Sequence, residues 1–118
     1  MKEIKFRIWD TCFEKYVNYK LKYKNGKLYG IYRHPIVIEQ YIGLKDKNGK
    51  EIHEGDIVEW WDKLGVVKYE KEFTTYNIYA IKNGKVTDSW FELSERMTPN
   101  TKIIDNVHDN NRKLLEKK

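Results

Sequence analysis

The tetrapeptide Lys-Asn-Gly-Lys occurs three times in this chain, at residues 24–27, 47–50 and 82–85, and these three copies decide the fold. Asn-Gly between two alternating runs is a strong signal for a β-hairpin, because its tight turn needs positive φ at both central residues. The copies are unequally spaced and their flanks differ, so they do not indicate a repeat protein. We interpret them as corners between strands and not as a repeated ligand-binding unit.

The first copy lies between two runs that are typical of strands. Before the turn, Tyr19, Leu21 and Tyr23 alternate with lysines, and a period of two is the pattern of a strand. We therefore predict a hairpin whose second strand covers residues 28–33, with Tyr23 opposite Leu28.

Further strands follow from similar patterns. Ile4, Phe6 and Ile8 alternate with residues 5, 7 and 9, as in a strand that buries one face. The second Lys-Asn-Gly-Lys lacks alternating flanks, so we expect a tight loop there, whereas the third lies in a second hairpin. The remaining predicted strands cover residues 36–42, 57–61, 65–69, 76–82, 85–93 and 102–107.

These elements predict a mainly β fold, namely a small SH3-like or half-open barrel built from short antiparallel strands and hairpins. A short C-terminal helix is expected to begin at Asp109 or Asn110 and to carry Leu114 and Leu115, and it would need docking to be stable. With 118 residues, the chain is expected to form one domain over residues 1–118.

The composition limits where the protein works and what it contacts. A net charge of +5 is concentrated in the basic residues 1–50, whereas residues 51–118 are slightly acidic. This asymmetry suits an anionic partner or head-to-tail association between unlike faces, and it is also found on ordinary solvated surfaces. Because Cys12 is the single cysteine and no apolar run is long enough to span a membrane, we expect a soluble, cytoplasmic protein without disulfides.

The sequence shows little sign of catalysis. His34, His53 and His108 are far apart, and none has metal-ligand spacing with another histidine, a cysteine or a carboxylate. At residues 54–56 we expect Gly55 to take an unusual backbone angle and Asp56 to accept backbone N–H groups. We therefore predict no enzyme, no catalytic residue, no cofactor and no metal. A deep pocket that gathers Glu54, Asp56 and a histidine would instead favour an enzyme.

The first hairpin supports a nucleic-acid hypothesis. Five side chains on one of its faces could contact phosphates and stack on a base: Lys20, Lys22, Lys24, Lys27 and Tyr29. Lysines along an exposed strand also protect it from edge-to-edge aggregation, so the pattern has a purely structural explanation as well.

The tryptophans support a protein-interface hypothesis. Trp9, Trp61 and Trp90 fall on the charged sides of their predicted strands, whereas Trp60 falls on the side of Val58. Large aromatic side chains on polar faces need cover, either from another part of this chain or from another chain.

Several segments resemble the YopX family of phage and prophage proteins. They are Met-Lys-Glu-Ile-Lys-Phe-Arg-Ile-Trp-Asp at 1–10, the block from Gln40-Tyr41-Ile42-Gly43 to Glu54-Gly55-Asp56-Ile57-Val58, and Ile104-Asp105-Asn106-Val107 through Leu114-Leu115. The resemblance implies a mainly β fold with a small barrel and an origin in a phage or an integrated prophage. It implies no reaction, so no catalytic residue is carried over.

Two functional hypotheses remain open. The first is a non-enzymatic, phage-encoded interaction module in the bacterial cytoplasm, which forms a homo-oligomer or binds a host or phage protein through Trp9, Trp61 and Trp90. The alternative is a nucleic-acid-binding barrel that uses the basic hairpin. Rising salt should weaken phosphate contacts steeply and leave aromatic association unchanged or stronger.

Overall fold

The structure, a computed structural model, describes residues 5–18, 22–29, 36–72, 74–108 and 114. These residues form strands and one short 3-10 turn, η1 (Thr98–Asn100). The strands are β1 (Phe6–Asp10), β2 (Lys15–Val17), β3 (Lys22–Lys24), β4 (Lys27–Tyr29), β5 (Ile36–Lys45), β6 (Glu51–His53), β7 (Asp56–Trp60), β8 (Lys63–Glu70), β9 (Thr75–Lys82), β10 (Lys85–Glu92) and β11 (Thr101–Asn106).

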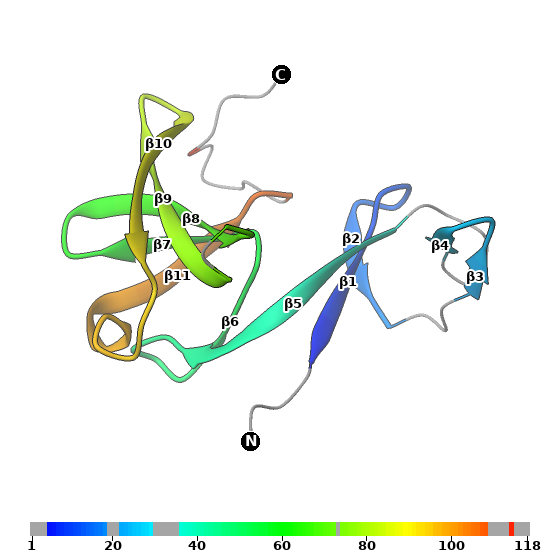
Figure 1. The fold of residues 1–118 in the computed structure, drawn as a ribbon, viewed down its shortest axis with the longest axis horizontal. Helices are drawn as coiled ribbons and strands as arrows, with labels where there is room; N and C mark the ends of the chain where they lie inside the picture. The colour runs from blue at the N-terminus through cyan, green and yellow to red at the C-terminus, as the bar shows by residue number, and fades with distance from the viewer. Residues whose placement is uncertain (1–4, 19–21, 30–35, 73, 109–113, 115–118) are drawn as a thin grey trace.

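The strands build two main sheets and a separate hairpin (Figure 1). The first sheet has the order β2-β1-β5-β6, and the second, which curls into a half-barrel, has the order β10-β9-β8-β7-β11. β3 and β4 form a two-stranded sheet of their own. Every strand pairing described is antiparallel, so the predicted mainly β, half-open architecture is confirmed.

The three Lys-Asn-Gly-Lys segments form corners. Asn25 and Gly26 have φ of 52° and 77°, and Asn83 and Gly84 have φ of 54° and 77°, so both hairpin turns use two left-handed residues. The second copy lies in a loop where Asp46 Oδ1 accepts hydrogen bonds from two backbone N–H groups, both at 2.9 Å. Both hairpins and the loop agree with the predictions.

β5 connects the two parts of the molecule. Its first half pairs with β1 over Ile36 to Gln40, and its second half pairs with β6 at Tyr41 and Lys45. Between Tyr41 and Lys45 the register shifts, and Gly43 takes a φ of 90°. The strand therefore leaves one sheet and enters the neighbourhood of the other without a loop (Figure 1).

The hydrophobic core lies inside the half-barrel. Buried side chains from several strands pack together there: Ile42, Ile52, Val58, Trp60, Val67, Ile78 and Leu93. Trp60 belongs to this core beside Val58, as the alternation indicated. None of the described segments is a helix long and apolar enough to cross a membrane.

Three details of the predicted elements need correction. β2 was not predicted, because its three residues are too short to show a pattern. In β1 the face of Phe6 is not the buried one, since Phe6 is 56% exposed and Trp9 is 5% exposed. The expected C-terminal helix falls on residues 109–113 and 115–118, which lie outside the described residues, and Leu114 is not helical.

Candidate functional site

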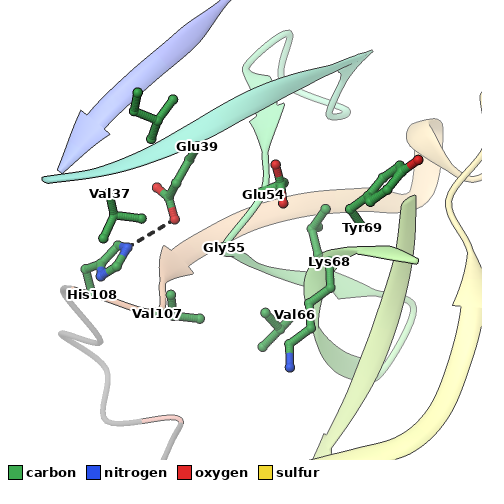
Figure 2. A pocket seen from close by; sticks show the side chains of 11 residues that line it. Val37, Glu39, Glu54, Gly55, Val66, Lys68, Tyr69, Val107 and His108 are labelled. Carbon is green, nitrogen blue, oxygen red and sulfur yellow. Dashed lines mark hydrogen bonds and ion pairs between the residues drawn. The ribbon is translucent and has the colours of Figure 1, made fainter. Parts of the chain in front are cut away.

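A site with several polar side chains lies in a cleft between the two sheets (Figure 2). This inter-sheet cleft has a volume of about 440 Å³, and strand β5, the turn before β7, strand β8 and the chain after β11 line it. Its lining residues are Val37, Ile38, Glu39, Glu54, Gly55, Val66, Val67, Lys68, Tyr69, Val107 and His108.

Unpaired strand edges border this cleft on two sides. Tyr41 N donates a hydrogen bond to Lys5 O. Since every second residue of β5 bonds to its neighbour on this side, the backbone N–H and C=O groups of residues 37, 39 and 41 point towards β1. Because alternate residues of a strand turn their backbone groups to opposite edges, Ile36 and Ile38 direct theirs away from β1, towards the cleft. On β8, Val67 O accepts from Gly55 N, so the backbone groups of Tyr69 also point away from β9. Two strand edges thus face the same opening.

Gly55 joins the walls of the cleft. Its N–H donates to Val67 O and its carbonyl accepts from Val107 N, each at 2.9 Å. Its φ is 86°, as predicted for this turn, and an added Cβ would collide with Glu39 Oε2. Only glycine allows both this backbone conformation and the close approach of Glu39.

Arg7 lies between two buried carboxylates, one of which, Glu39, lines the cleft. Its Nε donates to Glu39 Oε1 at 2.9 Å, and its Nη2 donates to Asp56 Oδ1 at 2.7 Å. Nη2 also donates to the Glu54 carbonyl at 3.2 Å. Asp56 Oδ2 accepts from His53 N at 2.8 Å, so Asp56 ties the backbone as predicted. Buried charges are tolerated only when they are paired in this way.

Glu39 has further partners on its other side. Tyr16 Oη donates to Glu39 Oε1 at 2.7 Å, and His108 Nε2 lies 3.1 Å from Glu39 Oε2. The His108 ring stacks on Trp9 with 4.7 Å between centroids, and Tyr16 meets Trp9 edge-on at 4.9 Å. The segment after β11 is therefore held against the first sheet by the contact between His108 and Glu39, which Figure 2 shows, and by the stack of His108 on Trp9.

Burial shifts the proton affinities of these groups. It raises the pKa of the Asp56 carboxyl to about 6, against the opposing influence of Arg7 and the His53 N–H. Burial and the hydrogen bond to Glu39 raise the pKa of the Tyr16 hydroxyl. Burial, with Glu39 nearby, also raises the pKa of Glu54, whereas burial and Arg7 lower the pKa of His53. Shifts of this kind occur in functional sites and in structural ion networks alike.

The acidic side chains at this site are engaged in an ion network. The cleft does gather Glu54 and His108, with Asp56 beside them, yet the carboxylates of Glu39 and Asp56 are both occupied by Arg7. Within the described part of the chain, no hydroxyl or thiol nucleophile lies within hydrogen-bond distance of the His108 ring. No group of three or more described His, Cys, Asp or Glu side chains could hold a metal ion.

The second candidate surface is aromatic and lies on the half-barrel. Trp61 occupies the two-residue turn between β7 and β8, is 66% exposed and has a φ of 51°. It is a turn residue and not the last residue of a strand, because β7 ends at Trp60. On the neighbouring edge strand β10, Trp90 is 45% exposed and Phe91 is also exposed. We name Trp61, Trp90 and Phe91 the rim aromatics.

The turn that carries Trp61 lies against β10. Lys63 Nζ is 4.8 Å from the centroid of the Phe91 ring. A second groove, of about 370 Å³, runs between them and is lined by Asp62, Lys63, Leu64, Ala80, Ile81, Lys82, Ser89 and Phe91. Phe91 therefore borders a concave surface at the open edge of the sheet, whereas Trp90, the residue before it, points to the opposite face of β10.

Trp9 does not belong to this surface. It is 5% exposed and lies beneath Tyr16 and His108 of the same chain. The Trp9 ring is therefore covered by side chains of its own chain, which is one of the two explanations given above for a tryptophan on a charged strand face. We therefore remove Trp9 from the candidate protein interface.

The basic hairpin has the predicted register in its described part. Lys22 pairs with Tyr29, Tyr23 with Leu28 and Lys24 with Lys27. Because directly opposed residues share a face, the first and third of these pairs lie on one face. Lys20 and the pairings expected for residues 19, 21, 30 and 32 lie outside the described residues.

The Arg7–Glu39–His108 network was not recognised in the sequence. One signal was present, since Glu39 interrupts the apolar run of residues 36–42 and a charge within a buried strand needs a partner. Its partners lie far away in the chain, and no local pattern names them.

Comparisons with known proteins support the family resemblance. The chain is similar in structure to protein EF1440 from Enterococcus faecalis, with a TM-score of 0.53 and 23% sequence identity over 97% of this chain and 99% of that chain. At this identity, the similarity concerns the fold alone. No curated protein matches the chain. The family model described as YopX protein matches residues 5–116. Because that match covers nearly the whole sequence, this chain belongs to the YopX family.

Proposed function

We propose that this protein is a non-enzymatic interaction module, encoded by a phage or prophage, that binds a second copy of itself or another protein through the rim aromatics. The conformation of Trp61 carries this proposal. A bulky side chain at a φ of 51° is strained where glycine or asparagine would be relaxed, and its apolar ring is mostly in water. The backbone strain and the exposure of the ring are both explained if the Trp61 ring contacts a partner.

The surroundings of Trp61 suit a protein partner. Tryptophan is enriched among the residues that dominate binding energy at protein interfaces. Phe91 lines the groove beside this turn, and Trp90 is exposed on the opposite face of β10, whose outer edge is the end of the five-stranded sheet. An edge strand with exposed aromatic side chains can pair with another chain through its backbone and its side chains.

A Trp61→Gly variant tests the proposal. Glycine relaxes the left-handed turn, so the melting temperature should stay the same or rise. Self-association or partner binding should weaken by about tenfold or more, as expected when a dominant interface residue is removed. Sedimentation analysis gives the mass of the protein, and a pull-down from infected cells tests for other partners.

Phe6→Ser provides a matched control, because Phe6 is another exposed aromatic side chain but lies on β1, outside the five-stranded sheet. If Trp61→Gly, Trp90→Ser and the control all keep the parent mass and the parent partners, the rim aromatics are not an interface.

The nucleic-acid alternative is supported by one observation, namely that the register of β3 and β4 agrees with the hairpin on which it rests, with Lys24 paired to Lys27 beside the turn. Phosphate contacts would make the affinity for single-stranded DNA or RNA fall steeply with salt. Failure to shift either nucleic acid at low salt would remove this alternative.

A further inference from the structure

We propose that the β3–β4 hairpin of one copy docks into the inter-sheet cleft of a second copy, where it adds a strand to the open edge of β5. The contact joins unlike surfaces, a basic arm and an acidic cleft, and it does not involve the rim aromatics. It is therefore independent of the proposed function.

The cleft offers what an incoming strand needs. The N–H and C=O groups of Ile36 and Ile38 face it from one side and those of Tyr69 from the other. Within the described part of the chain, no backbone group bonds to these edges. Strand addition to such an edge satisfies backbone groups of both chains and so provides affinity. Val37 and Val66 supply apolar lining.

The negative charge of the cleft favours a basic strand. Glu39 and Asp56 share the single guanidinium of Arg7, and Glu54 lines the cleft without a described ion-pair partner (Figure 2). Lys68 also lines it, but its ammonium lies 5.7 Å from the ring centroid of Tyr79. Glu39, Asp56 and Glu54 thus outnumber the guanidinium of Arg7 in charge.

The hairpin offers the complementary partner. Among the described strands, β3 and β4 pair only with each other, and an isolated two-stranded hairpin is marginally stable in water. Lys24 and Lys27 are exposed beside the turn, and Tyr23 is 74% exposed. The hairpin lies at the opposite end of the molecule from the β7–β8 turn (Figure 1). The hairpin would therefore gain stability from pairing with a further strand, and its lysines complement the negative charge of the cleft.

Reciprocal exchange of hairpins between two copies would give a closed dimer. If each of two copies placed its hairpin in the cleft of the other, both contacts would be equivalent about a twofold axis, as in a domain-swapped dimer. The ion pairs between hairpin lysines and Glu54 lie at the open side of the cleft, so rising salt should weaken this dimer. Association through the rim aromatics should hold or strengthen.

A charge swap in the full-length chain tests the proposal. Glu54→Lys changes the cleft, and Lys24→Glu with Lys27→Glu changes the hairpin. Each change alone should weaken dimerisation by about tenfold or more, and the chain that combines all three should recover a large part of it. Sedimentation of nuclease-treated protein measures the dimer. A folding defect cannot produce this pattern, because adding substitutions does not restore a misfolded chain.

Cross-linking gives a second measurement. In a mixture of isotope-labelled and unlabelled protein, a zero-length carbodiimide should join Lys24 or Lys27 of one copy to Glu54 of the other. The proposal is overturned if the parent protein is monomeric, if the single changes leave dimerisation unaltered, if the combined chain does not recover, or if no cross-link joins unlike copies. Loss of association in Trp61→Gly alone would support the proposed function and contradict this inference.

Discussion

The half-barrel and the junction between the two sheets are held together by different chemistry. Inside the half-barrel, Val58, Val67 and Ile78 are completely buried in an apolar core. At the junction, the buried side chains include the carboxylates of Glu39 and Asp56, which are joined by a guanidinium. Apolar packing is non-directional and tolerates small shifts, whereas an ion network fixes one geometry and loses most of its value when one member is removed.

The difference suggests a division of labour. The core provides most of the stability, because apolar burial is the dominant favourable term in folding. The network fixes how the first sheet and the segment after β11 meet the half-barrel, and so it shapes the inter-sheet cleft. Substitutions in the two regions should therefore have effects of different size and different pH dependence.

The largest effect is expected from Trp60→Ala. Trp60 is completely buried in the core, so its truncation removes a large apolar contact area and leaves a cavity. We expect a loss of about 3–5 kcal/mol in the free energy of unfolding, measured by urea denaturation. A loss below about 1 kcal/mol would show that the core is not the main source of stability.

Arg7→Met should have the next largest effect. It leaves Glu39 and Asp56 buried without their cation, which we expect to cost about 2–4 kcal/mol in unfolding free energy. Lys5→Met is a matched control, since Lys5 also pairs with a carboxylate, Glu51, but these two side chains are 42% and 31% exposed, against 22% and 6% for Arg7 and Glu39. The control should cost less than about 1 kcal/mol. Equal effects in the two variants would contradict the special role of the network.

The two regions should also differ in the pH dependence of stability. Burial raises the pKa of Asp56 at the junction to about 6, so the native state holds a proton that the unfolded chain releases between about pH 4 and 6. The contribution of Asp56 to stability therefore falls as pH rises through this window. Backbone N–H donors in the half-barrel loop, from Ile103, Lys50 and Asn48, outweigh burial and lower the pKa of Asp46.

The contribution of Asp46 is accordingly present above its ordinary pKa and is lost only in more acid solution. Urea denaturation between pH 3 and 7 gives the free energy of unfolding of the parent protein, of Asp56→Asn and of Asp46→Asn. The slope of this free energy against pH should differ from that of the parent protein in opposite directions for the two variants. Parallel curves would contradict the assignment of these shifts.

The smallest effect is expected from Tyr23→Ser in the hairpin. Tyr23 is mostly in water and β3 and β4 pair only with each other among the described strands, so the free energy of unfolding of the monomer should change by less than about 0.5 kcal/mol. A larger loss at low protein concentration would mean that the hairpin packs within its own chain.

The sequence revealed the half-barrel better than the junction, for a physical reason. Hairpins are local, and Asn83-Gly84 between alternating runs determines a turn and a register within a few residues. The faces of β1 could not be read locally. Its apolar residue Phe6 is exposed, and Trp9 lies on the buried face with Arg7, because β5 and the segment after β11 supply partners for them.

The tryptophans show the same limit. The alternation places Trp60 on the side of Val58, and the structure buries both side chains in the core. Trp61 was assigned to a charged strand face, but the strand ends one residue earlier and Trp61 occupies the turn. A tryptophan in a left-handed turn has no sequence signature, since the turn residues that signal one are glycine, asparagine and aspartate.

Strand β5 has a consequence for how the chain folds during synthesis. Because its first half pairs with β1 and its second half with β6, β1 leaves the ribosome with its hairpin partner β2 but before its second partner, β5, exists. The half-barrel, by contrast, is built mainly from hairpins whose strands are made in immediate succession. The N-terminal sheet can therefore be completed only after β5 has been synthesised. The synthesis of β5 sets the order in which the nascent chain assembles.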